Sequence, residues 1–201
     1  MARSLDFYFD CSSPWTYLAF HAVQPLAKEV GATVVWKPIL VGGVFNAVNQ
    51  TVYDSRAKPN PLKQAYMLKD LAAWAKLYGL AIAFPPKVFP VNSVKAMRGA
   101  FVALDDGKLV PYATACFEAY WGADLDISKE TVIAEVAAKA GIDRQKFFAG
   151  IETESCKSRL RANTDEVMAR GGFGSPTMFV GDQMFFGNDR LPLVRAALER
   201  A

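Results

Sequence analysis

Histidine and cysteine are scarce in this sequence of 201 residues, which contains one histidine, His21, and three cysteines. The cysteines, Cys11, Cys116 and Cys156, are too widely spaced for a zinc site, and their odd number does not suggest a disulfide framework. A single histidine also leaves little basis for a histidine-based catalytic relay. We therefore predict no metal site and a reduced compartment, the cytoplasm.

Long apolar runs and an excess of one charge are also missing. No apolar stretch reaches about 18 residues, so we expect no membrane span, and residues 1–6 do not resemble a secretory signal. The net charge is only +3 and the basic residues are scattered, which argues against a nucleic-acid partner. The glycine patterns that bind phosphates and the GxSxG motif of serine hydrolases do not occur either.

The first forty residues predict a β-α-β unit. Residues 5–10 form an apolar, aromatic strand, residues 13–30 a helix and residues 33–36 a second strand. Ser13 and Pro14 are typical of a helix start, and Gly31 of a helix end. Pro25 is expected to kink or interrupt the helix. A β-α-β crossover favours parallel strands in a buried sheet.

Helices and loops are predicted from residue 44 to residue 170, with almost no strand signal. We expect one helix to start at Ser128 and end at Gly141, and another to start at Thr153 and end at Gly171. Residues 85–90 form a proline-rich rigid loop. Apolar residues recur at helical spacing in two further segments: Met67, Leu71, Trp74 and Tyr78; Val94, Met97, Phe101 and Leu104.

Strands return near the C-terminus. Residues 177–180 and 183–186 flank Gly181 and Asp182, a pair that suits a tight hairpin turn. Asn188 or Asp189 is expected to cap a last helix that ends near Arg200. The fold class is therefore α/β, with a large all-helical insertion between the two strand-containing parts.

Three segments are candidates for chemistry. Ser13 lies where a strand passes into a helix N-terminus, a position that stabilises anions and where a hydroxyl can donate to an external thiolate. Ser175-Pro176 precedes a strand and suits a cis-proline turn or an ordinary junction. At residues 186–190, backbone amides can bind a carboxylate and Asp189 an ammonium group. Simple helix capping also explains Ser13 and Asp189. Together the segments are expected at one edge of the sheet.

These segments resemble the 2-hydroxychromene-2-carboxylate isomerases, which share the DsbA-like thioredoxin family with kappa-class glutathione transferases. Residues 7–10 and 13–19 look like the family signature around a glutathione-binding serine, and residues 13–16 occupy the place of the CxxC motif. The resemblance covers nearly the whole chain. It implies a discontinuous thioredoxin-like domain of residues 1–43 and 171–201, a helical insertion domain of residues 44–170, and a homodimer.

The resemblance also implies the roles of individual residues. Ser13 is the implied catalytic residue, and Phe84 and Asn92 are the implied substrate contacts. The loop of residues 44–60 departs from the family pattern, so substrate contacts are not transferred to it. Glutathione is the implied cofactor, with these implied contacts: Ser13, Asn49, Lys63, Ser175, Phe186, Gly187, Asn188 and Asp189.

We therefore hypothesise a glutathione-dependent isomerase that acts on 2-hydroxychromene-2-carboxylate or a similar aromatic unsaturated keto acid. A kappa-like transferase that releases a conjugate and a non-catalytic module that binds glutathione or a peptide are the alternatives. A disulfide oxidoreductase is disfavoured, because Ser13 and Thr16 replace both cysteines of the motif and Cys11 is expected to be a buried, inert side chain.

Overall fold

The computed structural model describes residues 3–201; Met1 and Ala2, which belong to the N-terminal stretch interpreted above, lie outside it. One four-stranded sheet has the order β2-β1-β3-β4. β1 pairs with β2 in parallel, and the pairs β1–β3 and β3–β4 are antiparallel. The parallel β-α-β unit and the C-terminal hairpin are thus confirmed. The strands are β1 (Ser4–Phe9), β2 (Thr33–Pro38), β3 (Thr177–Val180) and β4 (Gln183–Phe186).

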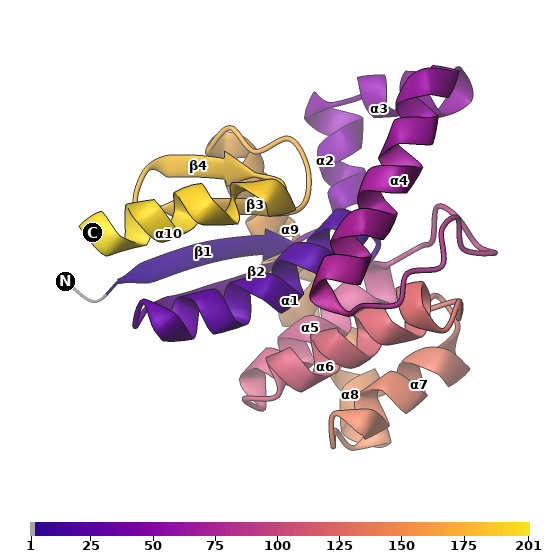
Figure 1. The fold of residues 1–201 in the computed structure, drawn as a ribbon. Helices are drawn as coiled ribbons and strands as arrows, with labels where there is room; N and C mark the ends of the chain where they lie inside the picture. The colour runs from indigo at the N-terminus through magenta and orange to yellow at the C-terminus, as the bar shows by residue number, and fades with distance from the viewer. Residues whose placement is uncertain (1–2) are drawn as a thin grey trace.

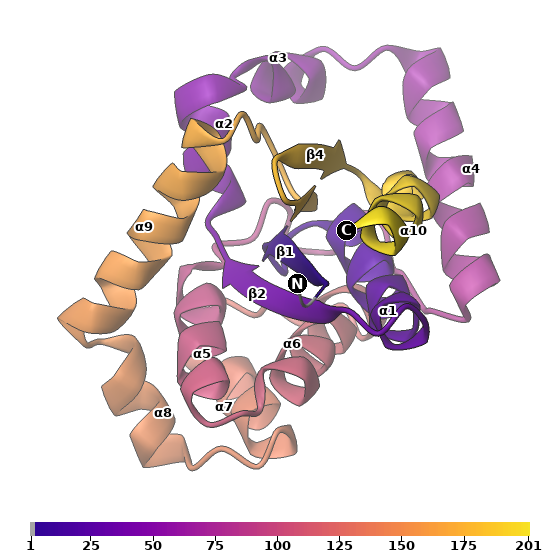
Figure 2. The ribbon, with the colours of Figure 1, turned by 90° about the vertical axis from the view of Figure 1, so that its left-hand side faces the viewer.

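Helices cover both faces of this sheet (Figures 1 and 2). α1 and α10 lie on one face and α9 on the other, while α5–α8 form a layer beyond the β2 edge. α2, α3 and α4 form an arm that passes above β4 in Figure 2. The helices are α1 (Pro14–Glu29), α2 (Val41–Val48), α3 (Thr51–Ala57), α4 (Pro61–Tyr78), α5 (Val94–Asp105), α6 (Leu109–Phe117), α7 (Glu130–Lys139), α8 (Arg144–Ile151), α9 (Glu154–Ala169) and α10 (Leu191–Arg200), with a π-helical turn at Glu118–Gly122 and a 3₁₀ turn at Asn188–Arg190.

An aromatic core joins the sheet to the helical layer. Phe20 on α1 packs against Trp36 of β2 and Phe117 of α6, with ring centroids 4.8 and 5.2 Å apart. One continuous cluster of buried side chains includes β1, α1 and α5–α8. This packing does not test the predicted division into two domains, which stays a prediction. None of the helices in residues 3–201 is long and apolar enough to cross a membrane.

Three details of the helices differ from expectation. α7 begins at Glu130 instead of Ser128, because the Ser128 hydroxyl donates to Asp126 in the preceding turn. α10 begins at Leu191 and has no side-chain cap from Asn188 or Asp189, since these residues form the 3₁₀ turn. α1 continues without interruption past Pro25, whose ring lies on the exposed side of the helix, where water can satisfy the freed carbonyl.

Candidate functional site

Ser13 is the N-cap residue of α1 and is partly exposed. Four residues after the end of β1, its extended backbone (φ −108°, ψ 123°) leads the chain into the helix, with Pro14 at the first helical position. The Ser13 Oγ accepts a hydrogen bond from the Thr16 N–H at 3.2 Å and donates one to the Ser175 carbonyl at 3.1 Å. Capping is therefore confirmed, and it leaves the hydroxyl proton directed at the second candidate segment.

Ser175 connects this second segment to both positions that replace the CxxC cysteines. The Ser175–Pro176 peptide bond is cis, as the resemblance implies. The Ser175 hydroxyl lies 2.8 Å from the Thr16 hydroxyl and accepts a hydrogen bond from the Asp10 N–H at 3.0 Å. Ser13 and Thr16 thus contact the backbone and the side chain of the same residue.

The third segment, residues 186–190, lies beside the second. Phe186 pairs with Thr177 across the hairpin, and the Gly187 N–H donates to the Pro176 carbonyl at 3.2 Å. Gly187 has a φ of 103°, a conformation that favours glycine. Asn188 is only 4% exposed, and its Nδ2 has no hydrogen-bond partner within residues 3–201. The predicted meeting of the three segments is confirmed, whereas their binding roles stay predictions.

Asp10 is a positioning residue that the sequence analysis did not identify. Its buried carboxylate accepts hydrogen bonds from the Ser12 N–H (2.9 Å), the Val41 N–H (2.9 Å) and the Ser93 hydroxyl (3.0 Å). Burial raises the pKa of Asp10, and these hydrogen bonds act in the opposite direction. The signal available in the sequence is a charged residue directly after an apolar strand and three residues before a helix cap. This one side chain ties the starts of α1, α2 and α5 together.

Cys11 is held inside the core. Its side chain is fully buried, and burial raises the pKa of its thiol well above the usual value. The Trp121 Nε1–H donates to the Cys11 carbonyl at 2.9 Å, and the Cys11 N–H donates to the Met97 sulfur at 3.3 Å. Such a thiol is neither accessible nor ionised, in agreement with its predicted inert role.

Aromatic side chains continue from Trp121 toward the solvent. Phe84 stacks near Trp121 with ring centroids 6.1 Å apart, and Phe89 lies 5.5 Å from Phe84. Asn92 is exposed, and its Oδ1 accepts a hydrogen bond from the Val94 N–H at 3.0 Å. Its amide N–H₂ group makes no hydrogen bond within residues 3–201 and can donate to another molecule. The predicted substrate contact Phe84 thus packs against Trp121, whose indole N–H donates to the Cys11 carbonyl.

The two predicted contacts on the helical arm differ in position. Asn49 Nδ2 donates to the Phe173 carbonyl at 3.0 Å, so Asn49 adjoins the segment of Ser175. Lys63 is exposed in the first turn of α4 and makes no side-chain hydrogen bond or ion pair with the three site segments as the structure describes them. Both binding roles stay predictions.

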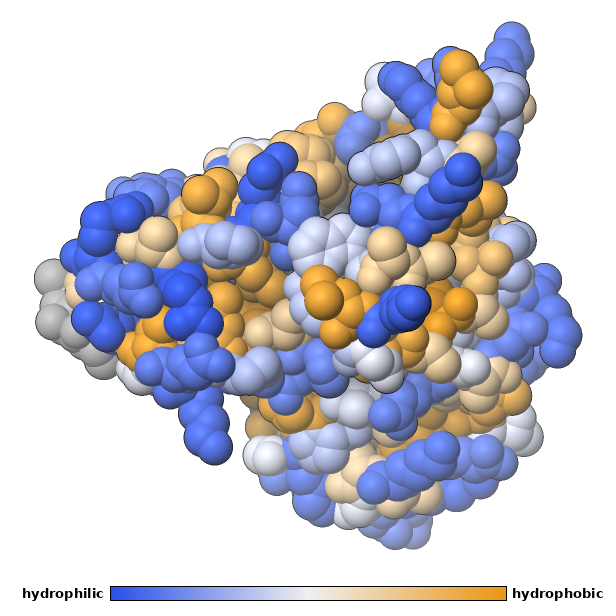
Figure 3. Space-filling view, viewed as in Figure 1, coloured by the Kyte–Doolittle hydropathy of each residue, from blue (hydrophilic) through white to orange (hydrophobic). Residues whose placement is uncertain are grey.

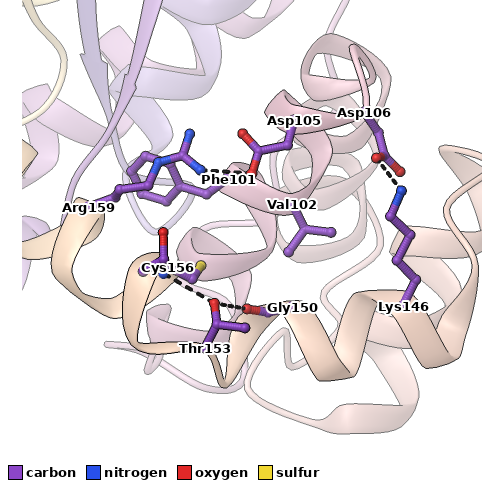
Figure 4. A pocket seen from close by; sticks show the side chains of 10 residues that line it. Phe101, Val102, Asp105, Asp106, Lys146, Gly150, Thr153, Cys156 and Arg159 are labelled. Carbon is purple, nitrogen blue, oxygen red and sulfur yellow. Dashed lines mark hydrogen bonds and ion pairs between the residues drawn. The ribbon is translucent and has the colours of Figure 1, made fainter.

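A hollow of about 220 Å³ lies elsewhere, among α5, α8 and α9 (Figure 4). Phe101 and Val102 contribute to its apolar part, and an ion pair joins Arg159 to Asp105 at 2.8 Å beside it. None of the predicted site residues lines this hollow. Its charged groups are already paired with each other, so it offers no chemistry for the predicted reaction.

The fold and the site define a DsbA-like thioredoxin protein with serine in place of the redox cysteine. A family model described as a DSBA-like thioredoxin domain matches residues 4–199. The 2-hydroxychromene-2-carboxylate isomerase of Pseudomonas putida is 33% identical over 196 residues, which cover 98% of this chain and 94% of the relative. The chain belongs to the 2-hydroxychromene-2-carboxylate isomerase family within the DSBA-like thioredoxin proteins.

Two further comparisons agree with this placement. The solved structure of a 2-hydroxychromene-2-carboxylate isomerase superposes with a TM-score of 0.82 at 32% identity, covering 98% of this chain and 95% of the other. Glutathione S-transferase kappa 1 of Rattus norvegicus is 26% identical over 208 residues, covering 96% of this chain and 89% of the relative. The similarity therefore extends through the sheet and the helical layer alike.

Proposed function

We propose that this protein is a glutathione-dependent isomerase of 2-hydroxychromene-2-carboxylate or a similar aromatic unsaturated keto acid. The observation that carries the proposal is the Ser13 hydroxyl, which sits at the N-terminus of α1 and points at the residue before a cis-proline. Similarity to the isomerases supports the reaction, and similarity to a kappa-class glutathione transferase supports the cofactor.

The residues around Ser13 suit glutathione. The buried Asn188 amide has a donor without a partner, which fits a carbonyl or carboxylate of a peptide-like ligand. The Ser175 N–H donates to no backbone carbonyl in the described loops, and Asp189 is exposed beside Asn188, where its carboxylate suits an ammonium group. Donors for the anionic groups and an acceptor for the cation thus lie on the Ser175 segment, which contacts Ser13, and on the adjoining segment of residues 186–190.

Ser13 and the start of α1 would favour the ionised form of a bound thiol. A free thiol with a pKa near 8.5 is only a few per cent ionised at neutral pH. Lowering that pKa by about two units requires about 2.7 kcal/mol of preferential stabilisation. One hydrogen bond to a charged group contributes ~1.5–3 kcal/mol, and the helix dipole adds to it. A hydrogen bond from a serine hydroxyl at this position, together with the helix dipole, can therefore supply the stabilisation that this shift in the thiol pKa requires.

When bound, glutathione supplies a nucleophilic sulfur that adds reversibly to a conjugated carbon, so that rotation about the former double bond becomes possible before elimination. The protein's own groups hold the aromatic acid and its developing charge. Phe84 offers an aromatic face to the substrate ring. The free N–H₂ group of Asn92, or the Lys63 ammonium, would donate to the enolate oxygen.

Replacement of Ser13 tests the proposal. Ser13→Ala removes the donor to the sulfur, so kcat/KM for 2-hydroxychromene-2-carboxylate, followed by absorbance with saturating glutathione, should fall roughly 10- to 200-fold. Ser13→Cys should do less damage. Thr153→Ala is the matched control, because Thr153 caps α9 through the Cys156 N–H and its loss affects a helix start away from the site. Unchanged turnover in Ser13→Ala would rule out this role.

Conjugation is the second candidate, favoured by the similarity to kappa-class transferases. The same serine would then activate the sulfur, but a stable thioether would leave the enzyme. Mass spectrometry of the products separates the two activities, since the isomerase returns glutathione unchanged. Binding of glutathione without turnover of any aromatic keto acid would instead indicate a non-catalytic module.

We also propose a reduced, cytoplasmic location. Cys11, Cys116 and Cys156 are all free and buried, so these residues need no oxidising compartment. Cell fractionation is the direct measurement. The implied homodimer likewise remains a proposal.

A further inference from the structure

Arg56 lies near the end of α3, in the arm segment to which the family's substrate contacts do not transfer. Its guanidinium carbon is 5.6 Å from the ring centroid of Phe45 and 5.3 Å from that of Phe89. Phe45 belongs to α2, and Phe89 to the proline-rich loop before α5. The guanidinium therefore joins two parts of the molecule that are more than forty residues apart in the sequence.

The charge of Arg56 is not neutralised by a carboxylate of the described chain. Arg170 also lies over two rings, but it pairs with Asp6 at 2.6 Å. Arg159 lies over Phe101 and pairs with Asp105 at 2.8 Å. Among residues 3–201, the arginines with ion pairs are Arg98, Arg159, Arg170, Arg190 and Arg195. Arg56 thus retains all its donors for an external anion.

Both rings that contact Arg56 lead back to the Ser13 site. On one side, a Cβ built on Gly174 would lie 3.7 Å from Phe45, and Gly174 directly precedes Ser175. On the other side, Phe89 lies 6.4 Å from Trp121, whose indole N–H donates to the Cys11 carbonyl. The two chains of contacts thus reach Ser175, which accepts the Ser13 hydrogen bond, and Cys11, two residues before Ser13.

Aromatic surface near Arg56 is accessible to a ligand. Phe89 is 37% exposed, and Phe186, which contacts the Gly174 position, is 38% exposed. Phe173 packs against Phe186 with ring centroids 4.4 Å apart and is itself 39% exposed. Exposed ring faces beside an unpaired cation match a flat aromatic molecule that carries an anionic group.

We propose that Arg56 binds the carboxylate of the aromatic substrate and thereby sets the preference for aromatic acids. This inference rests on the proposed function for the identity of the substrate. The guanidinium presents a planar fork of donors that matches a carboxylate, and the flanking Phe45 and Phe89 rings hold that fork in orientation while leaving its edges free.

Binding of a stable analogue separates this inference from catalysis. Chromone-2-carboxylate would be titrated calorimetrically into the full chain and into Arg56→Met and Arg56→Lys, in each case with and without glutathione. We expect Arg56→Met to raise the Kd for the analogue by at least about tenfold, and Arg56→Lys to raise it less. The Kd for glutathione and the weak affinity for uncharged chromone should not change.

Lys58→Met is the matched control, since Lys58 follows α3 directly and makes no cation–π contact among the described residues. Its Kd for the analogue should stay at the wild-type value. An unchanged Kd in Arg56→Met, or an equal loss in Lys58→Met, would overturn the assignment of Arg56. If Arg56→Met loses the analogue but the wild type shows no glutathione-dependent isomerisation, the anion site stands and the proposed function fails. If the wild type isomerises the substrate normally and Arg56→Met binds the analogue with an unchanged Kd, the proposed function stands and the anion site at Arg56 fails.

Discussion

At the residue scale, the site depends on the carboxylate of Asp10, which is surrounded by hydrogen-bond donors. Both oxygens of Asp10 accept hydrogen bonds, from two backbone N–H groups and the Ser93 hydroxyl. A buried acceptor of this kind is difficult to replace, because a neutral group of the same shape cannot accept at both oxygen positions. Asp10 therefore holds the start of α1 relative to α2 and α5 without touching a substrate.

Asp10→Asn tests this role. The new amide group must place its N–H₂ against a backbone N–H, so we expect the free energy of unfolding to fall by about 1–3 kcal/mol. Urea unfolding followed by circular dichroism measures this loss. Asp165→Asn, on the exposed side of α9, should have almost no effect. Equal stability of the Asp10 variant and the wild type would contradict the role given to the carboxylate.

The residues of the site were accessible to sequence analysis to different degrees. Ser13 and Ser175 stand beside prolines at element boundaries, which is a local signal. The partners of Asp10 are not local, since Val41 and Ser93 lie 31 and 83 positions away. Arg56 was missed for the same reason: its two ring contacts come from separate segments, and a lone arginine in a loop-like stretch has no distinguishing pattern.

At the element scale, local signals predicted most of the helices and strands, and failed where two polar residues competed for one helix start. Ser128 had the right residue type for a cap, but its N–H and hydroxyl both donate to the Asp126 carboxylate. This turn precedes the helix, which starts two residues after Ser128. The hairpin succeeded because Gly181 (φ 58°) supplies the backbone conformation that its turn demands. The packing of α5 against α6 and α8 had no sequence signal of comparable strength.

Gly99 on α5 lies at that packing contact. A Cβ at this position would overlap the Tyr112 hydroxyl and would lie 2.5 Å from Phe147 ring atoms. Gly99→Ala is therefore expected to lower the free energy of unfolding by about 1–3 kcal/mol despite the better helix propensity of alanine. Thermal unfolding provides the measurement.

Gly42→Ala on α2 is the matched control, because nothing lies within 4 Å of its added Cβ. In this variant the higher helix propensity of alanine, which is worth up to ~1 kcal/mol, is not offset by a steric clash, so the Tm should rise. A Gly99→Ala protein that is as stable as Gly42→Ala would show that the α5 contact is looser than the structure indicates.

At the scale of the whole molecule, the arm of α2–α4 is the part that sequence analysis described least well. None of the residues of α3 is buried, and α4 exposes Leu62, Tyr66 and Leu77. Figure 3 shows apolar side chains among hydrophilic ones in its upper right part, where α3 and the first turns of α4 lie. Exposed apolar residues of this kind are compatible with the homodimer that the resemblance implies, which stays a prediction.

Stability of the whole chain should decrease at alkaline pH. Burial, followed by the charge of Glu118, raises the pKa of Tyr17 to about 12. In the unfolded chain this phenol ionises near pH 10, so above pH 10 the unfolded state releases a proton that the folded state retains, and the free energy of unfolding falls as the pH rises toward 12. The loss from this group is at most about 1.4 kcal/mol per pH unit.

Tyr17→Phe keeps the stacking on Phe117 and removes the titrating hydroxyl. Urea unfolding at pH 7, 9, 10 and 11 should therefore give a shallower alkaline decline for this variant than for the wild type, although the other buried tyrosines still titrate. Parallel declines in both proteins would show that Tyr17 ionises equally easily in the folded and unfolded chain.

If the protein binds glutathione as proposed, the hydrogen bond from Ser13 to the Ser175 carbonyl has a consequence for which form of sulfur can bind. An incoming sulfur must draw the hydroxyl away from an oxygen that already accepts its proton. An uncharged thiol is a weak acceptor and cannot compensate for the bond that is given up, whereas an anionic sulfur can. Under the proposed function, the resting contact would therefore favour binding of the thiolate, the reactive protonation state, over binding of the thiol.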